Sequence, residues 1–295
     1  MAAKTNINTA KVTADTARID QLKERQRSTP QELDFERIRI MKEVYEETAG
    51  DVQILRRAKF LAAMLDRKKI FIDDNLFVGT MAGSYMAIYP NPEWNVLWMK
   101  EVKTVENSKT KEDKEANEWA LDYWDKRGLK SRTESIFKQR YGFDPTPTYQ
   151  AGLVVPFHDW PGGGGNLNYP MVYQQGLASA IKDVEERMMS LEMRLDNTDK
   201  LYFYQASLIV MKAVVRWANR YAALAREMAE KETDLTRKAE LISMAETCEW
   251  VPEHPARNLR EAMQCHFFCH LVAELEQVGC GYSQAYLGQN LEPYY

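Results

Sequence analysis

The segment from Asp199 to Lys231 constrains the fold most, because its apolar residues recur at steps of three and four. The recurring positions are Leu208, Met211, Val215, Ala218, Ala222 and Ala225. This spacing places the side chains on one face of an α-helix. A helix of this length needs other apolar faces to cover its stripe, so the sequence predicts a mostly helical fold.

Other segments share helical apolar spacing or helix-start signals. We expect further helices over residues 30–49, 52–67, 111–127, 132–141, 170–195, 235–248 and 259–278. Residues 69–79 are β-rich around an Asp-Asp-Asn turn, which predicts two short strands. Residues 80–102 are expected to form a buried loop, and residues 142–169 another irregular stretch. The organisation predicted is a polar tail or helix over residues 1–28 and one domain over residues 29–295.

Charge and cysteine usage limit the possible partners and compartment. The net charge is −4, which gives no electrostatic reason to expect nucleic acid or an anionic membrane as a partner. No apolar stretch approaches the ~20 residues that cross a bilayer, and the first residues lack a signal-peptide segment. Four cysteines in 295 residues are too sparse for a disulfide framework. We therefore expect a cytoplasmic protein with no membrane partner.

The densest set of potential metal ligands is Cys265, His266, Cys269 and His270. On a helix, residues four apart share a face and can bind one metal ion. The run lies in an apolar segment, however, where free cysteines are usually buried. A tetrahedral site also needs a second ligand pair, and His158, His254, Cys248 and Cys280 are isolated. Core packing is therefore favoured, and a metal site is the alternative.

Four glycines, Gly162 to Gly165, precede Asn166 and the helix expected from Pro170. Free N–H groups at a helix N-terminus suit a carboxylate or phosphate, and glycines allow close backbone approach. An exposed flexible loop explains the same residues equally well. Neither a dinucleotide fingerprint nor a Walker motif is present. The neighbouring His158 and Asp159 would point to opposite sides of an extended segment, so they do not form an obvious catalytic pair.

Several short segments follow one another in a characteristic order. They are Glu36-Arg37-Ile38, Arg56-Arg57-Ala58-Lys59, Ile72-x-Asp74-x-Leu76-x-Val78-Gly79, Arg220-Tyr221-Ala222, Ala245-Glu246-Thr247-Cys248, Val251-Pro252-x-His254-Pro255-Ala256, Glu261-Ala262-x-Gln264 and Gly288-Gln289-x-Leu291-x-Pro293-Tyr294-Tyr295. Their succession over nearly the whole chain resembles the glycyl-radical enzyme family, of the pyruvate formate-lyase-like type. The nearest likeness is to the dehydratase and decarboxylase branches.

The resemblance implies a fold and a reaction. The fold is a ten-stranded α/β barrel, of which this chain corresponds to the helical N-terminal portion and first strands. In the family, a glycyl radical generates a cysteine thiyl radical that abstracts hydrogen from the substrate. Both radical-bearing residues lie beyond Tyr295 in such enzymes, so no catalytic residue is expected here, and Cys248, Cys265, Cys269 and Cys280 are not the thiyl cysteine. The apolar end at Leu291 to Tyr295 also suggests an incomplete chain.

The resemblance also implies partners. The radical is installed by an iron–sulfur activating enzyme that uses S-adenosylmethionine, and this segment itself binds no cofactor. The complete enzyme is expected to form a homodimer, to act on a small molecule and to belong to anaerobic metabolism.

A loop similar to residues 157–165 contributes to the substrate pocket in related enzymes. Here the aromatic position is Phe157, and the polar position eight residues on is Gly165. The expected substrate-binding residues are Phe157, His158, Asp159, Trp160, Gly164, Gly165 and Asn166. Gly288-Gln289 resembles the arylacetate decarboxylase branch, so we expect a carboxylate-bearing substrate and C–C or C–X cleavage. The alternatives are a hydroxyproline or diol dehydratase and a non-catalytic helical binding protein derived from the family.

Overall fold

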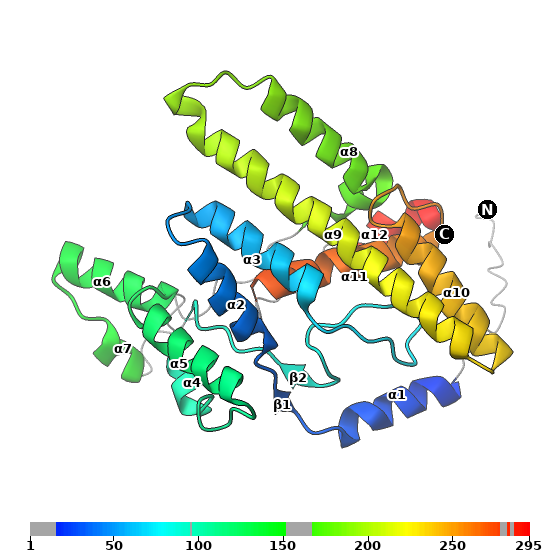
Figure 1. Cartoon of the computed structure of the whole chain (residues 1–295), viewed down its shortest axis with the longest axis horizontal. Coiled ribbons are helices and arrows are strands. Elements are labelled where there is room, and N and C mark those ends of the chain that lie inside the picture. The colour runs from blue at the N-terminus through cyan, green and yellow to red at the C-terminus, as the bar shows by residue number, and fades with distance from the viewer. Residues whose placement is uncertain (1–15, 95, 152–166, 278–281, 284–285) are drawn as a thin grey trace, which may run out of the picture.

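A computed structural model describes residues 16–94, 96–151, 167–277, 282–283 and 286–295 (Figure 1). The described chain is mostly helical, as predicted. The helices are α1 (Thr16–Ser28), α2 (Glu36–Glu47), α3 (Gln53–Arg67), α4 (Val96–Glu101), α5 (Lys111–Asp125), α6 (Leu129–Tyr141), α7 (Thr146–Gln150), α8 (Tyr169–Met189), α9 (Thr198–Lys231), α10 (Leu235–Trp250), α11 (Leu259–Glu276) and α12 (Leu287–Leu291). Short 3-10 turns follow at Leu195–Asn197 and Glu292–Tyr294.

The long helix α9 organises the fold. Its most extensive contacts are with α3 and α10. The preceding helix α8 lies antiparallel along the first half of α9, so the two form a helical hairpin (Figure 1). The predicted stripe faces these helices: Ala218, Ala222 and Ala225 are buried. Trp217 and Tyr221 are also fully buried and stack edge-on with centroids 5.4 Å apart. Small and aromatic residues thus alternate along α9, which lets neighbouring helices approach closely while the rings fill the space between them.

The two strands predicted within residues 69–79 are wrong. Among the described residues, the only strands are β1 (Glu32–Leu33) and β2 (Ala87–Ile88), which pair in parallel. The loop over residues 69–80 satisfies its backbone differently, since both the N–H and the C=O of Val78 bond the Gln264 amide, at 2.9 and 2.7 Å. A side chain of α11 thus replaces a neighbouring strand.

The predicted Asp-Asp-Asn turn within this loop is confirmed. The Asp73 carboxylate accepts hydrogen bonds from the backbone and the side chain of Asn75. Such local side-chain bonds favour a turn over a strand ladder.

The helix predicted over residues 170–195 is shorter and interrupted. It ends at Met189, and Gly176 has a positive φ of 73° within it. Beyond Gly176, the N–H groups of Leu177 and Ala178 donate to the carbonyls of Pro252 and Glu253. The segment between α10 and α11 therefore packs into the break in α8. No helix of the described part has both the length and the apolar character needed to cross a membrane.

Candidate functional site

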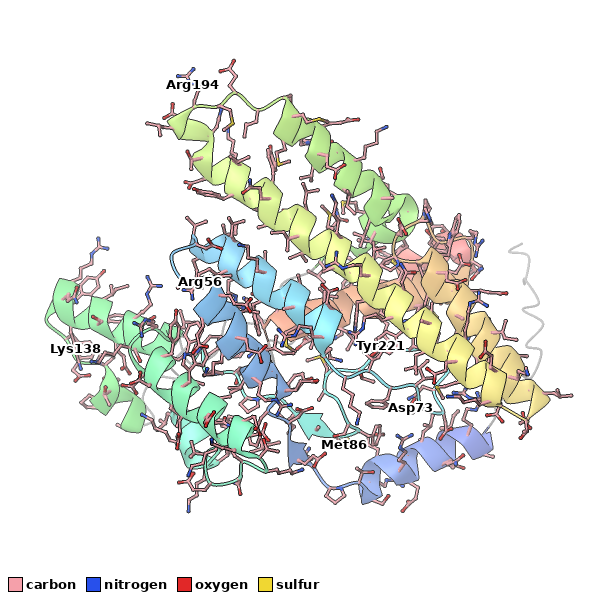
Figure 2. All side chains as sticks on the ribbon, viewed as in Figure 1. Arg56, Asp73, Met86, Lys138, Arg194 and Tyr221 are labelled. Carbon is pink, nitrogen blue, oxygen red and sulfur yellow. The ribbon has the colours of Figure 1, made fainter. Side chains whose placement is uncertain are left out.

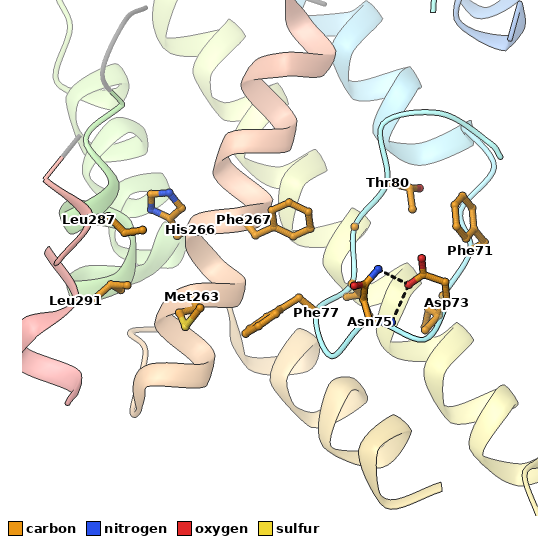
Figure 3. Close-up of a pocket in the computed structure, with 13 residues that line it drawn as sticks. Phe71, Asp73, Asn75, Phe77, Thr80, Met263, His266, Phe267, Leu287 and Leu291 are labelled. Carbon is orange, nitrogen blue, oxygen red and sulfur yellow. Dashed lines mark hydrogen bonds between the residues drawn. The ribbon is translucent and has the colours of Figure 1, made fainter. Parts of the chain in front are cut away.

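An apolar cavity of about 350 Å³ opens between the loop over residues 71–80, helix α11 and helix α12 (Figure 3). Its apolar walls include Phe71, Phe77, Met263, Phe267, Leu287 and Leu291. Its polar groups include Asp73, Asn75, Thr80 and His266. Figure 3 shows Phe267 and His266 on α11, with the loop residues on one side and the α12 leucines on the other. Mostly apolar walls with a few polar groups are typical of small-molecule sites.

The loop wall of this cavity is held by long-range hydrogen bonds. The Thr80 N–H donates to the Tyr221 hydroxyl of α9 at 3.0 Å (Figure 2 labels Tyr221). The buried Lys68 ammonium donates to the Thr80 carbonyl at 2.8 Å. Burial lowers the pKa of Lys68 to about 8. Both donor and acceptor side chains, Lys68 after α3 and Tyr221 on α9, are fully buried, so they fix the loop without contributions from a ligand.

Gly79 lets the same loop pass close to α11. Its φ is +134°, and a Cβ atom there would lie 2.5 Å from Leu271 Cδ1 and 3.2 Å from the Phe267 ring. Only glycine fits this position without displacing the cavity wall. The motif that contains Gly79 therefore shapes the cavity, although sequence reasoning assigned it to a strand.

Among the described residues that line the cavity, the one with a charged side chain is Asp73. It accepts the hydrogen bonds from Asn75, and the Arg25 guanidinium of α1 lies 3.5 Å away. These partners compensate its charge, which reduces its repulsion of an anionic ligand.

Two histidines of α11 contact two tyrosines of α8 at the His266 end of the cavity. The His266 ring stacks on Tyr169 with centroids 4.0 Å apart, and its Nδ1 lies 3.4 Å from the Tyr173 hydroxyl. His270 Nδ1 lies 3.3 Å from the Tyr169 hydroxyl. Burial raises the pKa of Tyr169 to about 12 and also raises that of Tyr173. Both phenols are therefore neutral hydrogen-bonding groups near pH 7 and fix the orientation of the imidazoles.

The predicted substrate-binding residues Phe157, His158, Asp159, Trp160, Gly164, Gly165 and Asn166 lie outside the described residues. The chain re-enters the described part at Leu167. Tyr169 follows and stacks on His266, which lines the cavity. Tyr169 therefore anchors the start of α8 beside the cavity.

Sequence reasoning missed most of the cavity itself. The missed walls are the loop over residues 71–80 and the face of α11 with Met263 and Phe267. The one available signal was that the Ile72 to Gly79 motif and the Glu261-Ala262-x-Gln264 motif occur together in the family pattern. The structure explains that association, since Gln264 binds the loop at Val78.

The cysteines of α11 belong to the core, as favoured from the sequence. Cys265 is fully buried, and Cys248 is buried as well. Hydrogen bonding to Cys269 and burial raise the pKa of the Cys265 thiol, which disfavours the thiolate that metals bind. Within the described ranges, no three His, Cys, Asp or Glu side chains come together in an arrangement that could hold a metal ion. Cys280 lies outside these ranges.

The family of this chain follows from its match to a known family model. A family model described as pyruvate formate lyase-like matches residues 9–295. The chain belongs to this family. The resemblance to glycyl-radical enzymes is therefore confirmed along nearly the whole sequence.

Relatives in this family catalyse several reactions. Isethionate sulfite-lyase of Oleidesulfovibrio alaskensis is 29% identical over 89% of this chain and 34% of its own length. Indoleacetate decarboxylase of Tractidigestivibacter scatoligenes is 30% identical over 59% of this chain and 19% of its own. The glycerol-bound B12-independent glycerol dehydratase of Clostridium butyricum is 26% identical and superposes with a TM-score of 0.82, covering 95% of this chain and 36% of that structure.

The chain spans about a third of the length of such relatives, at 34% of the sulfite-lyase and 36% of the dehydratase structure. The superposition confirms the predicted fold class, the helical N-terminal portion of a glycyl-radical enzyme. The cavity described above therefore belongs to that portion.

Proposed function

We propose that this chain is the N-terminal third of a glycyl-radical lyase, and that the cavity of loop 71–80, α11 and α12 forms part of its substrate pocket. The observation that carries the proposal is the continuous family match over residues 9–295. The fixed loop and the apolar walls support it, because radical chemistry requires a pocket that excludes water and competing hydrogen donors.

In the complete enzyme, the glycyl radical installed by an S-adenosylmethionine-dependent iron–sulfur activating enzyme would supply hydrogen abstraction through a cysteine thiyl. The residues of this chain position the substrate. Phe77 and Phe267 exclude water from one side of the cavity. The Asp73–Asn75 pair and Thr80 provide hydrogen-bonding groups at its loop end.

We propose a small, carboxylate-bearing substrate, with arylacetate decarboxylation as the preferred reaction. The arguments are the Gly165 position, which leaves room where dehydratases carry a polar contact, and the Gly288-Gln289 sequence. In this proposal, Phe157, His158, Asp159 and Trp160 provide wall side chains. The backbone N–H groups of Gly164, Gly165 and Asn166 bind the carboxylate. The decarboxylase relative supports this reaction, whereas the sulfite-lyase and dehydratase relatives represent the competing C–S and C–O cleavages.

The test is an anaerobic assay of the complete enzyme with its activating enzyme and three substrates: an arylacetate, trans-4-hydroxyproline and a 1,2-diol. We expect carbon dioxide release from the arylacetate. Turnover of the diol or hydroxyproline instead would overturn the substrate assignment. Failure to form an organic radical after activation would overturn the family-level proposal.

A matched pair of variants tests the cavity. Phe267→Ala removes a ring from the cavity wall, and we expect kcat/KM to fall by about tenfold, since roughly 1.4 kcal/mol of contact is lost. Phe203→Ala on α9 removes a ring that is 57% exposed and should leave kcat/KM unchanged. Equal effects of both variants on kcat/KM would show that the cavity is not part of the substrate pocket.

A further inference from the structure

A second cleft, of about 730 Å³, lies between α3, the end of α5 and the start of α6. Five cationic side chains line it: Arg56, Arg57, Lys126, Arg127 and Arg132. Figure 2 places Arg56 near the start of α3, facing the α5–α6 side of the molecule. Among the described residues, two carboxylates line the same cleft, those of Glu93 and Glu276. The described side chains that line the cleft therefore carry a net charge of +3.

Both carboxylates already have arginine partners. Glu93 is buried and bonds the fully buried Arg37 guanidinium, with Arg57 Nη1 at 3.6 Å. Glu276 accepts from Arg57 Nε at 2.9 Å. Burial would raise the pKa of Glu93, but Arg37 outweighs it, so the carboxylate stays ionised and bound to arginine. These two acids leave no charge to compensate the other cations of the cleft.

The other four cations face neutral partners or solvent. The Arg56 guanidinium donates only to neutral oxygens, those of Thr48, Tyr45 and Tyr123, at 3.2, 2.6 and 3.0 Å. Arg127 donates to the Tyr123 carbonyl at 2.9 Å.

Lys126 and Arg132 are exposed at the rim of the cleft. Neither side chain makes a hydrogen bond or ion pair with any residue of the described chain. Both are therefore available to an anion.

The start of α6 adds a further positive potential. Its N-cap is Gly128, which offers no side-chain cap, and its first turn carries no acidic residue. The N–H groups of Leu129 and Lys130 donate to the backbone carbonyls of Glu93 and Trp94, so the side chains and the helix dipole, rather than these N–H groups, would attract an anion. A cation such as Arg132 near a helix N-terminus is repelled by the helix dipole, which is unfavourable for stability. A bound anion would reverse this penalty, because it would be attracted by the dipole and by the guanidinium together.

We propose that this cleft binds the polyphosphate group of a small ligand, with Lys126, Arg127 and Arg132 contacting the phosphates. The planar guanidinium forms paired hydrogen bonds with phosphate oxygens, and three cations match a ligand with two or more phosphoryl groups. The cleft volume lies within the range that small-molecule sites occupy. Leu129 and Ile136 of α6 are 40% and 55% exposed and provide an apolar surface for an organic portion.

The test titrates the complete enzyme with inorganic triphosphate and, separately, with a nucleoside triphosphate, by calorimetry at low and high salt. We expect saturable binding of both, weakened by salt because the contacts are ionic. Tighter binding of the nucleotide would identify a nucleotide as the ligand, and equal binding would identify the phosphate chain alone. Both results support a polyphosphate site. Absence of saturable binding of either compound at millimolar concentration would overturn the proposal.

A charge-matched pair of double variants locates the site. K126Q/R132Q removes the two rim cations, and we expect affinity to fall by about tenfold or more, as for the loss of charge-assisted hydrogen bonds. K138Q/R140Q removes the same charge from α6 at positions that do not line the cleft, and should change affinity less than about twofold. Equal losses in the two double variants would show non-specific attraction and overturn the assignment. Since all four side chains are exposed, unchanged thermal melting should verify that each variant is folded.

Discussion

At the scale of single residues, the buried pair Arg37–Glu93 shows how this fold tolerates charge in its interior. Both side chains are almost inaccessible, at 0% and 6% exposed, and Glu93 directly precedes Trp94, which lines the cleft between α3, α5 and α6. Arg37 also donates to the Pro90 carbonyl, so the pair ties α2 to the loop before α4. Removing one partner of such a pair leaves the other charge buried and uncompensated.

We expect Glu93→Gln to lower the free energy of unfolding by about 3–5 kcal/mol at pH 7. Because the pKa of Glu93 is lowered from its ordinary value of 4.5, the wild-type carboxylate stabilises the fold above that pH. This stabilisation is lost as the pH falls below about 4.5. Urea unfolding at pH 7, 5 and 4 measures both effects, and the difference between wild type and variant should shrink at pH 4.

The control for this prediction is Glu249→Gln, which removes the partner of Arg226 on the surface. It should cost less than about 1 kcal/mol, because exposed ion pairs contribute little. A pH-independent difference between Glu93→Gln and wild type would contradict the role given to the charge of Glu93.

At the scale of elements, the sequence predicts helices better than it predicts the segments between them. The stripe on α9 is local, since each apolar residue is three or four positions from the next, and its burial follows from periodicity. The loop over residues 69–80 depends on Gln264, which is 186 positions from Val78. No local pattern near Val78 contains that partner, so β-propensity led to strands that do not form.

In the candidate site, too, the helix was predictable from local spacing, whereas the long-range contacts were not. Its α11 wall lies on a predicted helix, but the cavity exists only because the loop, α11 and α12 meet in space. The tyrosine–histidine contacts join residues 93 and 101 positions apart. Family resemblance supplied the motifs, and the structure supplied the reason that they occur together.

The break in α8 permits a test at this scale. Gly176 has φ of 73°, and a Cβ atom there would lie 2.4 Å from the Glu253 carbonyl oxygen. We expect Gly176→Ala to destabilise the protein by more than about 2 kcal/mol, since the backbone conformation and the clash with another backbone both oppose a side chain. Gly142→Ala is the matched control, because Gly142 also has a positive φ but no atom within 4 Å of the added Cβ. It should cost only about 1 kcal/mol. Equal costs in urea unfolding would show that the packing of residues 250–255 against α8 contributes nothing.

At the scale of the whole molecule, α1 connects parts that are far apart in the sequence. Arg18 bonds Glu240 of α10 at 2.7 Å, and Arg25 lies 3.5 Å from Asp73 of the cavity loop and over the Tyr85 ring. Figure 1 shows α1 at the edge of the molecule, below the end of α9 and the start of α10. Within α1, no residue from Ala17 to Ser28 is buried, so charge rather than an apolar face holds this helix.

This mode of attachment predicts a salt-dependent contribution to stability. We expect R18Q/R25Q to lower the free energy of unfolding by about 1–2 kcal/mol in 50 mM salt, since two partly exposed ion pairs and a cation–π contact are lost. In 1 M salt, where the screening length is about 3 Å, wild type and variant should differ by less than about 0.5 kcal/mol. Urea unfolding at the two salt concentrations measures the change, and Arg226→Gln, whose partner Glu249 lies away from α1, serves as the single-pair control. A loss that persists in 1 M salt would mean that apolar contacts dock α1. In that case apolar packing of α1, and not ionic attraction, would hold Arg25 beside Asp73.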